Sequence, residues 1–83
     1  DDFRAGLAKA RISLAEAVLR ANRVVAGDVL AAHLDVERED GELEVEYQVM
    51  ILRDGEIWEV EVDAVSGWVD EIEKMGLLDE VVG

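Results

Sequence analysis

The chain has 83 residues, the size of one small domain. Its 21 Asp and Glu against 8 Lys and Arg give a net charge of −13, which argues against nucleic acid or an anionic membrane surface as a partner, because both attract clustered positive charge. Cysteine is absent, so disulfides, zinc–thiolate sites and thiol nucleophiles are excluded.

The N-terminal part has the pattern of helices. Ser13-Leu14-Ala15-Glu16 has the form of a capping box, in which Ser13 accepts a backbone N–H and Glu16 reaches back. We therefore predict a short helix near residues 2–10, a break at 12–13, a main helix near 14–25 and a C-cap at Gly27. One unbroken helix is the alternative. The apolar stripe consists of Phe3, Leu7, Ala10, Leu14, Ala17, Ala21 and Val24.

From residue 28 the hydrophobic period becomes two, which is typical of strands. Alternating runs at 30–37, 43–52 and 57–64 are separated by the turn residues Asp40-Gly41 and Asp54-Gly55. A short fourth strand is predicted from Trp68 to about Ile72. From Lys74 onward the pattern favours neither helix nor strand.

These elements predict an α+β fold, with an N-terminal helix packed on one face of a three- to four-stranded antiparallel β-meander. The other sheet face is acidic and solvated. Residues 1–11 form an N-terminal helical extension, 12–73 the domain proper and 74–83 a C-terminal tail. The charge follows this division: residues 1–33 carry four acids and five bases, and residues 34–83 carry seventeen acids and three bases.

The acidic face has three competing explanations. If the second and third strands pair through Asp54-Gly55, the carboxylates lie close together, and opposed like charges destabilise a sheet. The first explanation is that the charges prevent copies of the chain from associating. The second is that the face binds a basic surface of a partner protein. The third is that it binds a hard divalent cation such as calcium. No calcium-loop spacing supports the last explanation. The candidate partner-binding carboxylates are Glu44, Glu46, Glu59 and Glu61.

The sequence predicts no enzyme. Ser13 is accounted for as a cap and Ser66 as a turn residue, and the single histidine, His33, lies on the polar side of the first strand. No Gly-rich phosphate loop occurs, so no cofactor is predicted. Paired carboxylates could perform acid–base chemistry only in a cleft that separates their pKa values, and an open sheet face offers none.

The two tryptophans differ in setting. Trp58 alternates with valines and is expected in the core. Trp68 follows a turn and is the candidate exposed contact for a partner, because aromatic residues often anchor interfaces.

The order of these motifs resembles the PepSY domain family. The residues that carry the resemblance are Ser13 to Ala17, Ala21 and the stretch from Asp54 to Val69. The closing Asp63-Ala64-Val65-Ser66-Gly67 is the most specific part. Asp63 and Ser66 can accept turn N–H groups and Gly67 can take a positive φ, so these three are expected to be structural turn residues. The loop at Gly27 lacks the family's usual proline, and Trp58 stands where tyrosine is more usual.

The resemblance implies a non-catalytic module of the kind found in propeptides of thermolysin-like metalloproteases and in small periplasmic or secreted proteins. It implies export, with the chain as a mature form, and a protein partner such as a protease that the domain regulates or inhibits. The abundance of Ala, Val and Gly, with Arg preferred over Lys, is typical of a GC-rich bacterial source. The alternatives are an acidic cation-binding domain and a structural or dimerising module, and we expect a monomer or weak dimer.

Overall fold

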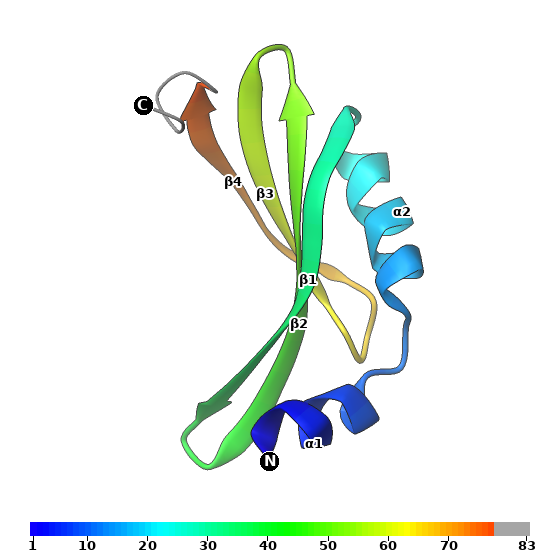
Figure 1. Ribbon diagram of the computed structural model, residues 1–83, viewed down its shortest axis with the longest axis vertical. Coiled ribbons are helices and arrows are strands. Elements are labelled where there is room, and N and C mark those ends of the chain that lie inside the picture. The colour runs from blue at the N-terminus through cyan, green and yellow to red at the C-terminus, as the bar shows by residue number, and fades with distance from the viewer. Residues whose placement is uncertain (78–83) are drawn as a thin grey trace.

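The computed structural model describes residues 1–77, which form two helices and one four-stranded sheet in the order β1-β2-β3-β4 (Figure 1). All neighbouring strands are antiparallel. The predicted α+β fold, with N-terminal helices on one face of an antiparallel meander, is confirmed. The elements are α1 (Asp2–Lys9), α2 (Leu14–Val24), β1 (Asp28–Glu39), β2 (Glu42–Arg53), β3 (Glu56–Asp63) and β4 (Val69–Leu77).

The helical region is interrupted as predicted, so the single-helix alternative is wrong. The Ser13 hydroxyl accepts the Glu16 N–H at 3.1 Å and caps α2. The second half of the predicted capping box is not formed, because the Glu16 carboxylate instead accepts from Arg20 Nε at 2.9 Å, one turn later.

The end of α2 also differs from the prediction, because the C-cap is Val25 rather than Gly27. Gly27 instead passes close to β2. A Cβ at this position would collide with the Leu52 carbonyl oxygen and would lie 2.9 Å from Ile51 Cγ2. Glycine is therefore required at this position because the loop passes too close to the sheet for a side chain.

Two tight turns set the register of the first three strands. Asp40 and Gly41 have φ of 51° and 81°, and Asp54 and Gly55 have φ of 52° and 76°. Positive φ at both central residues is the type I′ geometry that closes hairpins. The fourth strand is longer than predicted: β4 pairs with β3 as far as Leu77 opposite Glu56, although its side chains alternate little in burial. Residues 78–83 of the predicted tail lie outside the described part.

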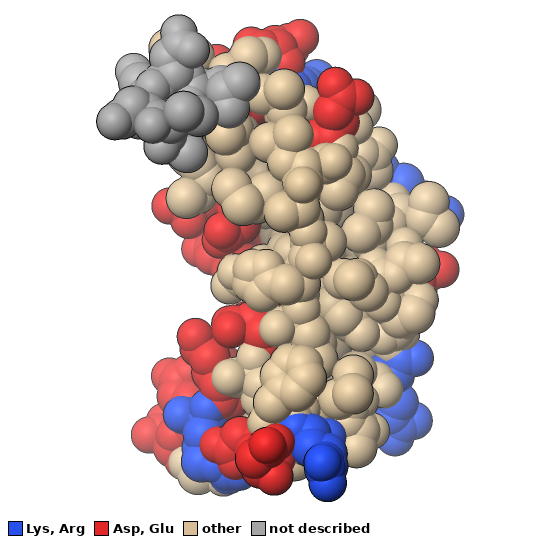
Figure 2. Space-filling view, in the orientation of Figure 1, with Lys and Arg blue, Asp and Glu red and all other residues tan. Residues whose placement is uncertain are grey.

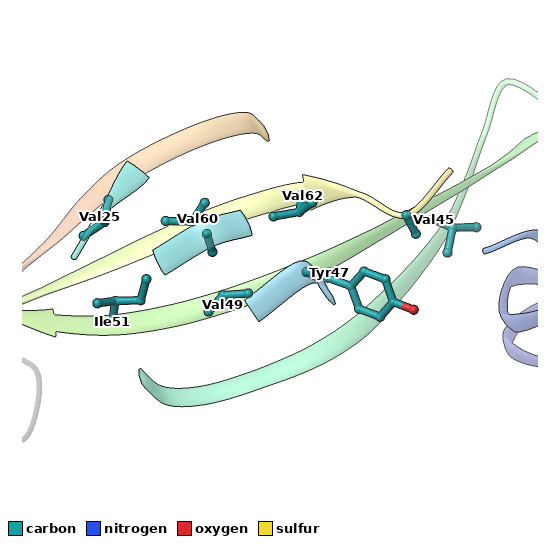
Figure 3. Packing of buried hydrophobic residues seen from close by; sticks show 10 residues of the cluster. Val25, Val45, Tyr47, Val49, Ile51, Val60 and Val62 are labelled. Atoms are coloured by element: carbon teal, nitrogen blue, oxygen red, sulfur yellow. The ribbon is translucent and has the colours of Figure 1, made fainter. Parts of the chain in front are cut away.

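The core lies between α2 and the sheet (Figure 3). Ala17 and Ala21 are fully buried, and these small side chains let α2 approach the strands closely. The Tyr47 hydroxyl donates to the Ile12 carbonyl at 2.7 Å, which satisfies a backbone group at the break between the helices. Trp58 is half-buried against this core. The labelled strand residues are Val45, Tyr47, Val49, Ile51, Val60 and Val62.

The sheet has one covered and one bare face. Both helices lie on the same side of the curved sheet (Figure 1), and the opposite side of the molecule is hollowed (Figure 2). Figure 2 shows Asp and Glu side chains gathered along that hollow side. No helix within residues 1–77 is long and apolar enough to cross a membrane.

Candidate acidic binding face

The bare side of the sheet carries carboxylates from all four strands (Figure 2). Alternation along each strand places them on the face opposite the core. We call this surface the acidic face, and it consists of Asp35 and Glu37 on β1, Glu44 and Glu46 on β2, Glu59, Glu61 and Asp63 on β3, and Asp70, Glu71 and Glu73 on β4.

Of the carboxylates expected to lie close together on β2 and β3, Glu46 and Glu61 are neighbours, and the register adds others. Glu46 lies opposite Asp63, and Glu44 lies opposite Glu37 of β1 rather than near β3. On the other side of β3, Glu61 lies opposite Glu71 and Glu59 lies opposite Glu73. The sequence-based prediction did not include Asp63 or the β4 carboxylates in this face. Counting residues outward from the Asp54-Gly55 turn would have placed Asp63 beside Glu46.

Glu46 is the most perturbed group of the acidic face. Burial, a hydrogen bond shared with the Asp70 carboxyl, and the negative charges of Glu61, Asp70 and Asp63 raise the pKa of Glu46 to about 8. The protonated form is therefore favoured at neutral pH.

Glu61 is perturbed by a similar mechanism. A hydrogen bond shared with the Glu71 carboxyl, burial, and the charges of Glu71 and Glu59 raise the pKa of Glu61 to about 7, although a hydrogen bond with Gln48 opposes the shift. The pKa of the exposed Glu44 is also raised, chiefly by the charge of Glu39. These shifts indicate a strong negative potential across the face.

A cavity of about 340 Å³ opens at one end of the acidic face, where β2 continues beyond the last residue of β3. Lys9 Nζ lies at this cavity and donates to the Leu43 carbonyl at 2.6 Å, so α1 is tied to the edge of β2 there. The acidic residues lining the cavity are Glu42, Glu44, Glu46, Asp63 and Asp70.

The turn between β3 and β4 is organised by Asp63. One oxygen of its carboxylate accepts the N–H groups of Val65 and Ser66 at 2.8 and 2.7 Å. Burial alone would raise the pKa of Asp63, but these N–H donors hold it below its ordinary value. The Ser66 hydroxyl accepts the Trp68 N–H at 3.2 Å.

Gly67 completes the same turn. It has φ of 81°, and its carbonyl accepts from Arg20 Nη1 at 3.0 Å. A Cβ at Gly67 would collide with that guanidinium, so the residue must be small as well as left-handed. The turn is thereby fastened to α2.

Trp68 borders the acidic face at the start of β4. Its side chain is 75% exposed, and its carbonyl accepts the Asp63 N–H at 2.8 Å. A large aromatic side chain held beside a charged surface is typical of interface anchors.

The residues considered for catalysis have structural roles or are exposed. The hydroxyls of Ser13 and Ser66 each accept a backbone N–H, and His33 is exposed on β1. Among the residues that the structure describes, no three His, Asp or Glu side chains are arranged to hold a metal ion.

Comparison with known proteins gave one family. The model of the PepSY family, described as "Peptidase propeptide and YPEB domain", matches residues 11–69. No curated protein and no solved structure matches the chain. The match covers the second helix, the first three strands and the Asp63–Gly67 turn, so the chain belongs to the PepSY family.

Proposed function

We propose that this chain is a non-catalytic recognition module whose acidic face binds a basic surface of another protein. The observation that carries the proposal is the register of the sheet, which places carboxylates opposite carboxylates, as in Glu37 with Glu44 and Glu59 with Glu73. Such pairs destabilise the isolated sheet, and a basic partner would relieve that repulsion.

The partner that best fits the family is an extracytoplasmic peptidase that the module regulates or inhibits. The description of the matched family names a peptidase propeptide, which supports a peptidase as the partner. The exposed indole of Trp68 would supply an apolar anchor beside the charged contacts. The location we propose is periplasmic or secreted.

Affinity capture and a peptidase assay test this proposal. The immobilised chain is offered purified thermolysin-like metallopeptidases, and both retention and residual proteolysis are measured. The test variant carries Glu59→Lys and Glu61→Lys. The matched control carries Asp40→Lys and Asp54→Lys, which change the charge equally at the exposed tips of the two hairpins.

We expect the control to bind like the unmodified chain and the test variant to bind about tenfold more weakly, because charge reversal at a complementary interface slows association. Equal binding by both variants would contradict recognition through the acidic face. Binding without any change in proteolysis would retain recognition but overturn inhibition.

A further inference from the structure

The outer edge of β1 is a long regular strand edge. Within residues 1–77 β1 has a neighbouring strand, β2, on one side only. After a bulge between Val29 and Ala31, β1 pairs with β2 without interruption as far as Glu39. An edge of this kind presents alternate N–H and C=O groups to an additional strand.

The hairpin turn determines which residues present those groups. Because Asp40-Gly41 is a two-residue loop, Glu39 and Glu42 are expected to be the hydrogen-bonded pair that closes the hairpin, and such pairs recur at every second residue. The outward-directed backbone groups of β1 therefore belong to the even-numbered residues Ala32, Leu34 and Val36.

An apolar cavity of about 420 Å³ lies beside the middle of this edge, between the helices and β1. Phe3 and Leu7 of α1 are 56% and 55% exposed there. Figure 2 shows an uncharged band running along the molecule between the acidic side and the basic groups of the helices. The apolar lining comprises Phe3, Leu7, Ala10, Ile12, Leu14, Leu34 and Tyr47.

We propose that β1 pairs with β1 of a second copy of this chain, antiparallel and about a two-fold axis at Leu34, so that the two sheets become one. A two-fold axis makes the contact self-complementary. Leu34 then lies opposite Leu34 of the second copy, beside the apolar cavities of both. On the opposite face His33 lies opposite Asp35 of the second copy, and the same pair forms again by symmetry.

Avoidance of like-charge pairs selects this register and this edge. A shift that centres the axis on Asp35 would oppose two aspartates directly, which destabilises an antiparallel pair. The β4 edge is interrupted by two irregularities, and self-pairing about Ile72 would oppose Glu71 and Glu73 twice. β1 thus offers the longer and better matched edge.

This inference goes beyond the proposed function and does not depend on it, because the second copy is the only partner required. The dimer would present two acidic faces on one continuous sheet. Sedimentation of the purified chain alone therefore tests it, whatever the outcome of the peptidase experiment.

Sedimentation equilibrium from micromolar to millimolar protein should show a monomer–dimer equilibrium that salt strengthens, because each copy carries a net charge of −13. His33→Asp should weaken the dimer about tenfold, since it creates two like-charge cross-strand pairs. The double variant His33→Asp with Asp35→His should restore it. The control Leu19→Asp makes the same charge change on the exposed side of α2 and should have a smaller effect.

Oxidative crosslinking tests the register, because the chain has no cysteine of its own. Leu34→Cys should form a disulfide-linked dimer, since a residue on the axis faces its own copy. Ile72→Cys, at the β4 edge, is the matched control and should crosslink more slowly. A monomer at every concentration and salt level, an unchanged dimer in His33→Asp, or faster crosslinking of Ile72→Cys would each overturn the proposal.

Discussion

Glu46 and Asp63 lie directly opposite each other on β2 and β3, yet their surroundings shift their pKa values in opposite directions. Asp63 accepts two backbone N–H groups of the following turn, which lower its pKa. Burial and neighbouring carboxylates raise the pKa of Glu46 to about 8. Asp63 is thus held ionised within the turn, whereas the protonated form of Glu46 is favoured at neutral pH.

The stability of the fold should have a maximum at mildly acidic pH. The pKa values of Glu46 and Glu61 are raised from 4.5 to about 8 and about 7. Between pH 4.5 and about 8 the folded state therefore binds more protons than the unfolded state, and stability falls as the pH rises through this range. The pKa of Asp63 is lowered, so its contribution is lost when the pH falls below about 4. Thermal unfolding followed by circular dichroism at a series of pH values measures both the loss of stability at high pH and the loss at low pH.

Glu46→Gln provides the control for that experiment. It keeps the size and hydrogen-bonding capacity of the side chain but cannot ionise. The decline of the unfolding midpoint between pH 4.5 and about 8 should become shallower in this variant. An unchanged decline would show that Glu46 is not its source.

Removal of the Asp63 carboxylate should destabilise the turn between β3 and β4. Asp63→Ala leaves the N–H groups of Val65 and Ser66 without their acceptor and should lower the free energy of unfolding by about 1–3 kcal/mol. Asp63→Asn retains an acceptor oxygen and should lose less. Chemical denaturation of both variants measures the difference, and equal losses would contradict this role for the acceptor oxygen.

The requirement for glycine at position 67 can be divided into two causes. Gly67 and Gly41 both have φ of 81°, but only a Cβ at Gly67 would meet a neighbouring side chain, that of Arg20. Gly41→Ala should cost about 1 kcal/mol from backbone strain alone. Gly67→Ala should cost more, as measured by denaturant unfolding, and a smaller cost than that of Gly41→Ala would contradict the crowding by Arg20.

The hydroxyl of Tyr47 should contribute measurably to the connection between the helices. Tyr47→Phe removes its 2.7 Å hydrogen bond to the Ile12 carbonyl while keeping the ring in the core. The free energy of unfolding should fall by about 0.5–1.5 kcal/mol, with the cost set by the carbonyl left without its donor. An unchanged midpoint in denaturant would show that the bond adds no net stability.

The fold could be predicted from local signals, because the period of apolar residues and the two Asp-Gly turns act over a few residues. The turn residues Asp40 and Asp54 fix positive φ, and with it the hairpin register. The predictions that were wrong concern features that depend on contacts between residues far apart in the sequence. Gly27 is required by the backbone of Leu52, and the length of β4 is set by pairing with β3 rather than by its own pattern.

The acidic face was predicted only in outline. Alternation placed Glu59 and Glu61 correctly on the face away from the core, but the carboxylates opposite them belong to β4, whose pairing the sequence left undefined. The pKa of Glu46 depends on burial and on Asp70, which lies at an irregularity in the pairing of β3 with β4. No local pattern in the sequence marks that irregularity.

The most direct test of recognition through the acidic face is the dissociation constant for a bound peptidase as a function of salt concentration. Calorimetric titration of the unmodified chain should show affinity falling steadily as salt rises, since screening weakens attraction between exposed charges. The Glu59→Lys and Glu61→Lys variant should bind weakly and lose most of that salt dependence. A dissociation constant independent of salt, or equal for the two proteins, would contradict the proposed role of the acidic face.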